Sequence, residues 1–171
     1  MDYQGWESSV PEAIKGDSLW KMKAYRLALF MARLGWRDAT KLMLDKRTLS
    51  LSDQLYRAVG SISANLAEGY SRSTGKDRAR FYEYALGSAR ESRDWYYRGQ
   101  DILGDEVASH RLLLLSQVIR LLLTMVPEQR ARSVREQDAT YRASPGDVPL
   151  EVTLTGEESD DLLRNVPVTD L

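Results

Sequence analysis

The sequence predicts an all-α protein, an antiparallel up-down four-helix bundle that assembles as a homo-oligomeric ring and ends in an acidic tail. Three observations favour this fold class. Apolar residues recur every three to four positions between residues 19 and 126, which is the helical period. Short polar or glycine-containing connections interrupt this period, and such connections make successive helices antiparallel neighbours. Strand-like alternation occurs only in the tail, at residues 151–155.

Three regions are expected along the chain. Residues 1–17 are polar, contain Pro11 and Gly16, and form an N-terminal lead-in. Residues 18–137 form the four-helix bundle, and residues 138–171 form a flexible acidic tail that begins near the Pro- and Gly-containing stretch 144–149. We therefore expect one folded domain with two appendages.

The four helices are expected over residues 19–43, 50–70, 76–103 and 105–126. Pro127 disfavours continuation of the last helix, although residues 128–137 can resume it. Gly69 is expected either as a C-cap or as a point of close packing. The inner face of the third helix is predicted to carry the following residues: Phe81, Tyr84, Ala85, Ser88, Ser92, Trp95 and Ile102.

Composition narrows the function classes. The chain has 171 residues, 43% of them hydrophobic, and no cysteine, which excludes disulfides and thiol catalysis. Residues 136–171 carry nine acidic and two basic side chains, whereas residues 1–135 carry 16 acidic and 22 basic ones. The protein is thus a basic body with an acidic tail. We expect a cytoplasmic protein with no membrane partner, because the apolar stretch 112–126 is shorter than the roughly 20 residues of a membrane span.

The fourth helix carries leucine on every side, and a helix of this kind must be covered on more than one side. We expect a second copy of the chain to cover it, so that the subunits close into a ring. The alternative is that the tail or the N-terminus docks on the same surface. The predicted oligomer interface consists of Leu112, Leu115, Ile119, Leu122 and Leu123.

Polar residues interrupt the apolar pattern of the second and third helices. Helical spacing places them on facing sides, where we expect a structural, hydrogen-bonded polar cluster of Ser61, Asn65, Glu68, Ser88 and Glu91. A di-iron site would need Glu-x-x-His pairs, and the single histidine, His110, belongs to none. We expect His110 to be structural or solvated, and we expect no metal, cofactor or catalytic residue.

Two segments carry a family resemblance. Residues 54–70 (QLYRAVGSISANLAEGY), followed by Phe81 and residues 85–91 (ALGSARE), resemble the four-helix bundle proteins encoded in intervening sequences of bacterial large-subunit rRNA genes. That family is related to the accessory variability determinant of diversity-generating retroelements. The resemblance covers residues 18–126 and implies a ring, usually a pentamer. For the accessory branch it also implies a basic surface that binds nucleic acid and a reverse transcriptase. Ser63, where the family often has Pro, and the long acidic tail depart from the pattern.

Basic residues form two groups that could contact phosphates. The first surrounds the turn before the third helix: Arg72, Lys76, Arg78 and Arg80. The second lies further along this helix, among Trp95, Tyr96 and Tyr97, and comprises Arg90, Arg93 and Arg98. Arginines among aromatics can hold single-stranded bases. The competing interpretations are ion pairing of the first group with Asp77 and Glu83, and packing of Trp95 in the core.

Two hypotheses on function follow. In the first, the protein is a non-enzymatic accessory protein that binds RNA or DNA and partners a reverse transcriptase or another nucleic-acid enzyme. In the second, it is an interaction scaffold whose ring displays several acidic tails to a partner protein. Enzymatic function is the least supported hypothesis, because the sequence contains no recognisable set of catalytic residues.

Overall fold

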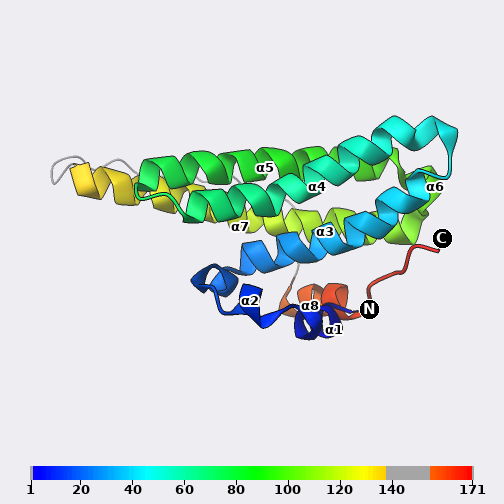
Figure 1. Ribbon diagram of the computed structural model, residues 1–171, viewed down its shortest axis with the longest axis horizontal. Coiled ribbons are helices and arrows are strands. Elements are labelled where there is room, and N and C mark those ends of the chain that lie inside the picture. Colours follow the sequence, from blue (N-terminus) through cyan, green and yellow to red (C-terminus); the bar gives the residue numbers. More distant parts are fainter. Residues whose placement is uncertain (1, 138–154, 171) are drawn as a thin grey trace.

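The computed structural model describes residues 2–137 and 155–170, and the regular structure in these ranges is entirely helical, which confirms the all-α prediction. Four long helices lie alongside one another with alternating direction (Figure 1): α3 (Lys23–Leu42), α4 (Leu49–Tyr70), α5 (Gly75–Arg98) and α7 (Asp105–Gln137). We call these four helices and their connections the helical body. Shorter helices, α1 (Tyr3–Ser9), α2 (Glu12–Lys15) and α8 (Gly156–Arg164), lie on one side of it (Figure 1).

The core lies between the four long helices. Helix α4 packs against α3 and α5, and α7 packs against α5 and α3. The central stripe of α4 consists of side chains that are at most 1% exposed: Leu55, Val59, Ile62 and Leu66. Their spacing of three and four residues places them on one face of the helix. Burying such an aliphatic side chain contributes about 1.5–3 kcal/mol to folding.

The inner face of α5 differs from the prediction. Tyr84 is 45% exposed, whereas Tyr82 and Tyr96 are 2% and 0% exposed. The buried side of α5 consists mainly of small residues and two tyrosines: Ala79, Tyr82, Ala85, Ala89, Ser92 and Tyr96. Tyrosine occurs both in protein cores and on surfaces, so the pattern of apolar residues alone gave an incorrect prediction of the buried face of α5.

Three helix boundaries also differ from expectation. The first predicted helix is divided into a 3₁₀ helix, η1 (Ser18–Lys21), and α3, and the third is divided at Gly99 into α5 and α6 (Gln100–Leu103). Gly104 follows α6 with a φ of 94°, a left-handed conformation that favours glycine. Helix α7 continues through Pro127, although proline supplies no backbone N–H for a helical hydrogen bond. A second 3₁₀ helix, η2 (Lys46–Thr48), joins α3 to α4.

The N-terminal residues are folded onto the body rather than forming a simple lead-in. Trp6 of α1 is 6% exposed, and its ring centroid lies 5.1 Å from that of Phe30 on α3. Tyr3 and Trp20 belong to the same aromatic cluster. Aromatic pairs at such distances add about 0.5–1.5 kcal/mol to the effect of burial, which attaches α1 firmly to α3.

The end of the chain is also packed, in contrast to the flexible tail that the sequence predicts. Thr155 caps α8 in a capping box with Glu158, and α8 contacts α1 and α7. Leu162 is only 8% exposed. The expected linker and all but the last residue of the strand-like stretch lie in residues 138–154, outside the described residues.

Residues Asp105–Ala131 of α7 are long and apolar enough to cross a membrane by length and composition alone. Half of the most apolar window is buried within the described part of the protein. One such helix is weak evidence of a membrane span, because a helix buried in a protein core passes the same test of length and composition.

A glycine pair in α4 tests the close approach of α4 and α5. A Cβ atom on Gly69 would lie 2.8 Å from Cε1 of Tyr82 and 2.9 Å from Cβ of Phe81, so Gly69 is the predicted point of close packing and not a C-cap. We expect Gly69→Ala to lower the free energy of unfolding by about 1–3 kcal/mol, measured by urea denaturation. Gly60→Ala meets nothing within 4 Å and should stabilise the protein by up to about 1 kcal/mol. Equal effects of the two substitutions would contradict this packing.

Candidate nucleic-acid interface and buried charge network

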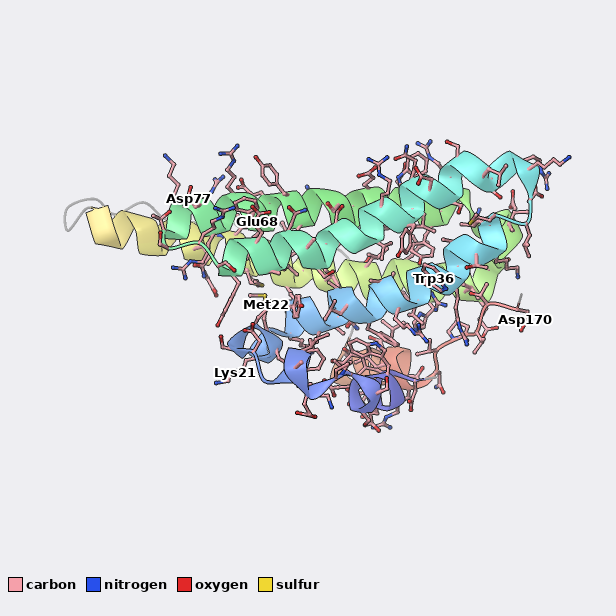
Figure 2. All side chains as sticks on the ribbon, in the orientation of Figure 1. Lys21, Met22, Trp36, Glu68, Asp77 and Asp170 are labelled. Carbon is pink, nitrogen blue, oxygen red and sulfur yellow. The ribbon has the colours of Figure 1, made fainter. Side chains whose placement is uncertain are left out.

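The first group of predicted phosphate ligands lies at the end of the body where α4 turns into α5, the end marked by Glu68 and Asp77 in Figure 2. Arg72 forms an ion pair with Glu68, and its guanidinium lies 4.6 Å from the ring centroid of Phe81. The Arg72 side chain is therefore already engaged within the chain.

The remaining members of this group differ in their availability. Arg78 is half-buried and donates to the carbonyl of Ser73 at 3.1 Å. Arg80 is exposed and donates from Nε to the Tyr84 hydroxyl at 2.7 Å. Lys76 is exposed. The expected pairing of this group with Asp77 and Glu83 is not what the structure contains. Asp77 accepts from Thr74, and Glu83 pairs with Arg130.

The second group surrounds a groove between α5 and α7. This groove has a volume of about 370 Å³ and is lined by Arg90, Arg93, Asp94, Tyr97 and Leu112. Tyr97 is 60% exposed, and Arg90 and Arg93 are exposed as well. Neither arginine forms an ion pair within the described residues. We call this feature the α5 groove.

Arg98 differs from the other two arginines of its group. It pairs with Asp94 at 2.9 Å, and its guanidinium lies 5.0 Å from the ring centroid of Trp95. Trp95 is half-buried and Tyr96 is fully buried, so only Tyr97 presents an exposed ring. The prediction that Trp95 packs inward is therefore correct in part.

The expected hydrogen-bonded cluster between the second and third helices does not form. Ser61 and Asn65 bond to carbonyls one turn earlier in α4, and Ser88 does the same in α5. Glu68 pairs with Arg72, and Glu91 accepts from Trp95, so each carboxylate contacts a residue four positions later in the chain rather than the facing helix. Local side chain-to-backbone bonds satisfy these groups, so no interhelical network is needed.

The predicted interface leucines need a similar correction. Leu115, Ile119 and Leu122 are 0%, 3% and 0% exposed within one chain, so they are core residues and not available to a partner. Leu112 and Leu123 are half-buried. Helices α5 and α3 and the C-terminal residues cover α7, which is the alternative that the sequence left open.

An apolar surface is exposed elsewhere, on α3 and α4. A groove of about 430 Å³ lies there, and its lining includes Trp36, Met43, Leu49 and Tyr56. Trp36, labelled in Figure 2, is 58% exposed, and Met43 is 61% exposed. Trp36, Met43, Leu49 and Tyr56 are four of the ten exposed large hydrophobic side chains in the described part, and together they line this groove as one patch. We call it the α3–α4 patch.

The most buried charges lie in a network that sequence reasoning missed. Asp38 of α3 is 0% exposed and accepts from Arg111 Nε at 2.8 Å and from the Tyr96 hydroxyl at 2.8 Å. Thr169, near the end of the chain, donates its hydroxyl to the same carboxylate. Burial and the negative charge of Asp38 raise the pKa of Tyr96 well above its ordinary value, so Tyr96 remains a hydrogen-bond donor.

His110 extends this network to α8. Its Nδ1 accepts from Arg111 at 2.9 Å, and its Nε2 donates to the Leu162 carbonyl at 2.7 Å, which is the arrangement of a neutral imidazole. Burial, followed by the positive charge of Arg111, lowers the pKa of His110 from 6.5 to about 4. The expectation of a structural histidine agrees with these contacts.

The polar atoms of the network bond to one another and to the C-terminal residues. Arg111 is 1% exposed, and its remaining donors reach Asp38 and the Pro167 carbonyl. Among residues 2–137 and 155–170, no three acidic or histidine side chains converge as metal ligands would. A small cavity of about 30 Å³ lies beside the network, between α3 and residues 166–169.

Comparisons with known proteins agree with the helical fold. The sequence model of the 23S rRNA-intervening sequence protein family matches residues 21–123. A crystal structure of a protein of unknown function from the S23 ribosomal protein family of Bacteroides thetaiotaomicron is similar, with a TM-score of 0.57 and 19% sequence identity. The alignment covers 60% of this chain and 97% of that one, and at this identity the likeness concerns the fold alone. No curated protein matches the chain.

His110 should make stability depend on pH. Unfolded chains take up a proton on this histidine near pH 6.5, whereas the folded protein does so only near pH 4. The free energy of unfolding should therefore fall as the pH drops from about 6.5 to about 4, by at most about 3 kcal/mol.

The control for this prediction is His110→Gln, whose amide can make both hydrogen bonds but does not titrate. Other carboxylates affect both proteins alike, so the difference between their stability–pH curves isolates His110. Parallel curves in urea denaturation between pH 4 and 7 would show that His110 is not held neutral.

Proposed function

Because the chain belongs to the 23S rRNA-intervening sequence protein family, we propose that it is a non-catalytic protein that binds RNA or DNA through the α5 groove. The observation that carries this proposal is the combination of Arg90, Arg93 and the exposed ring of Tyr97 in one groove. Neither arginine has an acidic partner within the described residues, so both are available to phosphates.

The chemistry of the groove favours single strands. A guanidinium binds a phosphate through parallel hydrogen bonds, and an exposed aromatic ring provides a stacking surface for one base. Bases of a duplex are already stacked on each other, so Tyr97 can stack only on an unpaired base. Stacking of this kind contributes about 1–3 kcal/mol per base and depends little on the base sequence.

The positive surface continues along α5 toward its beginning. Lys76 and Arg80 are exposed on the same helix, and 17 residues of helix place Lys76 about 26 Å from Arg93. The acidic helix α8 contacts α1 and α7, and Figure 1 shows it on the other side of the body from α5. A nucleic-acid strand that follows α5 therefore meets cations at both ends of the helix.

We also propose that the four long helices form the up-down bundle of a protomer that self-associates, with a pentameric ring favoured. The α3–α4 patch is the surface that supports this proposal, because a contiguous exposed apolar patch is typical of an interaction site. Self-association would multiply a weak cationic groove and raise the overall affinity for a long strand. This location replaces the α7 leucines as the proposed contact.

A protein partner, such as a reverse transcriptase or another nucleic-acid enzyme, and a cytoplasmic location belong to the same proposal. The alternative function, a scaffold that displays its acidic tail, receives less support. Residues 155–170 pack on their own chain, and Leu162, the residue best suited to anchor a partner, is buried there.

The double substitution Arg90→Ala and Arg93→Ala tests the α5 groove. Loss of two phosphate contacts should reduce affinity for fluorescent single-stranded RNA and DNA about tenfold or more at low salt. It should also reduce the slope of log affinity against log salt by about 1.4. Tyr97→Ala should weaken binding without changing this slope, because stacking releases no counterions.

The matched control is Arg57→Ala, which removes an exposed arginine that pairs with Asp53 on α4. This variant should bind like the wild type. The proposal fails if the wild-type protein has no affinity for either nucleic acid at low salt. It also fails if the double variant and Arg57→Ala weaken binding equally.

Met43→Glu tests the α3–α4 patch. Met43 is 61% exposed, so a charge there should leave the protomer folded while it disrupts an apolar contact between copies. In sedimentation or light scattering at micromolar concentration, we expect the wild-type protein to be oligomeric and Met43→Glu to shift toward monomer. Ile14→Glu, an exposed apolar position on α2, is the control and should remain oligomeric. A monomeric wild-type protein would contradict self-association.

A further inference from the structure

The last described part of the chain, residues 155–170, which we call the C-terminal segment, docks on the body through a defined set of contacts. Leu162 is buried, and its carbonyl accepts from His110. Ser159 accepts from Gln117 at 2.9 Å, and the Pro167 carbonyl accepts from Arg111 at 3.1 Å. The segment thus presents an apolar anchor and polar groups at fixed positions.

The final contact is the most selective. The hydroxyl of Thr169 donates to Asp38, which lies in the buried charge network. Asp38 is held by Arg111 and Tyr96 of the body, so the carboxylate is in place for a donor seven residues after Leu162. A buried carboxylate tolerates few alternatives to a hydrogen-bond donor, because leaving an acceptor unsatisfied is costly.

Charge attraction does not hold the segment. It carries five acidic side chains and one basic one, yet no ion pair within the described residues joins it to the body. All five acids are exposed, namely Glu157, Glu158, Asp160, Asp161 and Asp170. Recognition therefore depends on shape and hydrogen bonds, which distinguish one peptide sequence from another.

The covalent connection does not enforce this contact. Residues 138–154, 17 in number, connect α7 to the segment. Along α7, the 20 residues between Gln117 and Gln137 span about 30 Å, whereas 17 residues can extend to about 60 Å. The tether is long enough to allow docking and also long enough to allow release.

We propose that the face of α3 and α7 formed by Asp38, His110, Arg111 and Gln117 is a peptide-recognition site, and that the C-terminal segment is its reversibly bound ligand, which can also be supplied from outside the chain. The site recognises a capped helix whose leucine, Leu162, is buried, followed by a stretch that brings the hydroxyl of Thr169 to the carboxylate of Asp38. This interaction is independent of the α5 groove, so either proposal can fail alone.

The test uses full-length chains and a fluorescent synthetic peptide of residues 155–171. Leu162→Asp in the full chain should release its own segment and leave the site intact. We expect the wild-type peptide to bind this variant at least tenfold more tightly than it binds the wild-type chain, whose own segment occupies the site. A peptide with the same Leu162→Asp change should lose at least tenfold in affinity.

Two further chains complete the design. Val168→Asp is the matched control, because Val168 belongs to the same segment but is 51% exposed. This chain should exclude the peptide as the wild type does. Thr169→Val keeps the volume and removes the hydroxyl, and it serves as a milder opening variant if Leu162→Asp does not fold.

The pH dependence provides a second readout. His110 bonds directly to Arg111 of its own helix and to the Leu162 carbonyl of α8. Arg111 in turn bonds to Asp38 of α3, which also accepts from Tyr96 of α5. Protonated His110 cannot accept from Arg111 and would place two cations in contact. Burial, followed by the positive charge of Arg111, lowers the pKa of His110 to about 4, although the hydrogen bond to the Leu162 carbonyl raises it. Release of the C-terminal segment would remove part of this burial. Peptide affinity should therefore weaken by up to roughly 30-fold between pH 7.5 and pH 5.

The proposal is overturned if the peptide binds neither opening variant while both keep the helix content of the wild type by circular dichroism. Equal binding to the wild-type, Val168→Asp and Leu162→Asp chains would also overturn it, because this result would mean that the peptide binds elsewhere. An affinity that does not change with pH would contradict docking at the His110 contact.

Discussion

The ion pair between Asp38 and Arg111 connects most parts of this fold. Both side chains are almost completely inaccessible to solvent, at 0% and 1% exposure. Removing two charges from water costs several kcal/mol per ion, so such a pair is tolerated only where further hydrogen bonds satisfy its atoms. Here those bonds come from Tyr96, His110, Thr169 and the Pro167 carbonyl. Helices α3, α5 and α7 must therefore be in register for the pair to be stable, and the docked C-terminal segment supplies the remaining hydrogen bonds.

The docked C-terminal segment covers one surface of the body and leaves the α3–α4 patch and the α5 groove exposed. The C-terminal segment covers α7 and lies against α1, so the leucine-rich helix is not the exposed apolar face that its sequence indicates. The α3–α4 patch is an exposed apolar surface elsewhere on the body, and neither its lining nor that of the α5 groove includes a residue that hydrogen-bonds to the C-terminal segment. Self-association, strand binding and peptide recognition are thus assigned to different faces and do not compete for the same residues.

Sequence reasoning identified the local features and missed the distant ones. The α4 stripe and the close packing at Gly69 were predictable, because helical spacing and the absence of a Cβ atom are visible in one short segment. Of the candidate interface, Arg90, Arg93 and Tyr97 were predicted, but not that they share a groove with Leu112 of α7. The buried face of α5 was placed incorrectly, since tyrosine occurs both in cores and on surfaces and Ser and Ala give little contrast.

Asp38 illustrates the difference between what local sequence patterns predict and what only contacts between distant segments decide. In the sequence it follows Arg37 within a helix and resembles an ordinary solvated charge. Its partners Tyr96, Arg111 and Thr169 are 58, 73 and 131 residues away. The sequence by itself determined the all-helical class, the approximate positions of the four long helices and the cationic character of α5, because these depend on neighbours within a few turns. Only the tertiary structure decided which charges are buried and which apolar faces remain open, because burial depends on what distant segments cover.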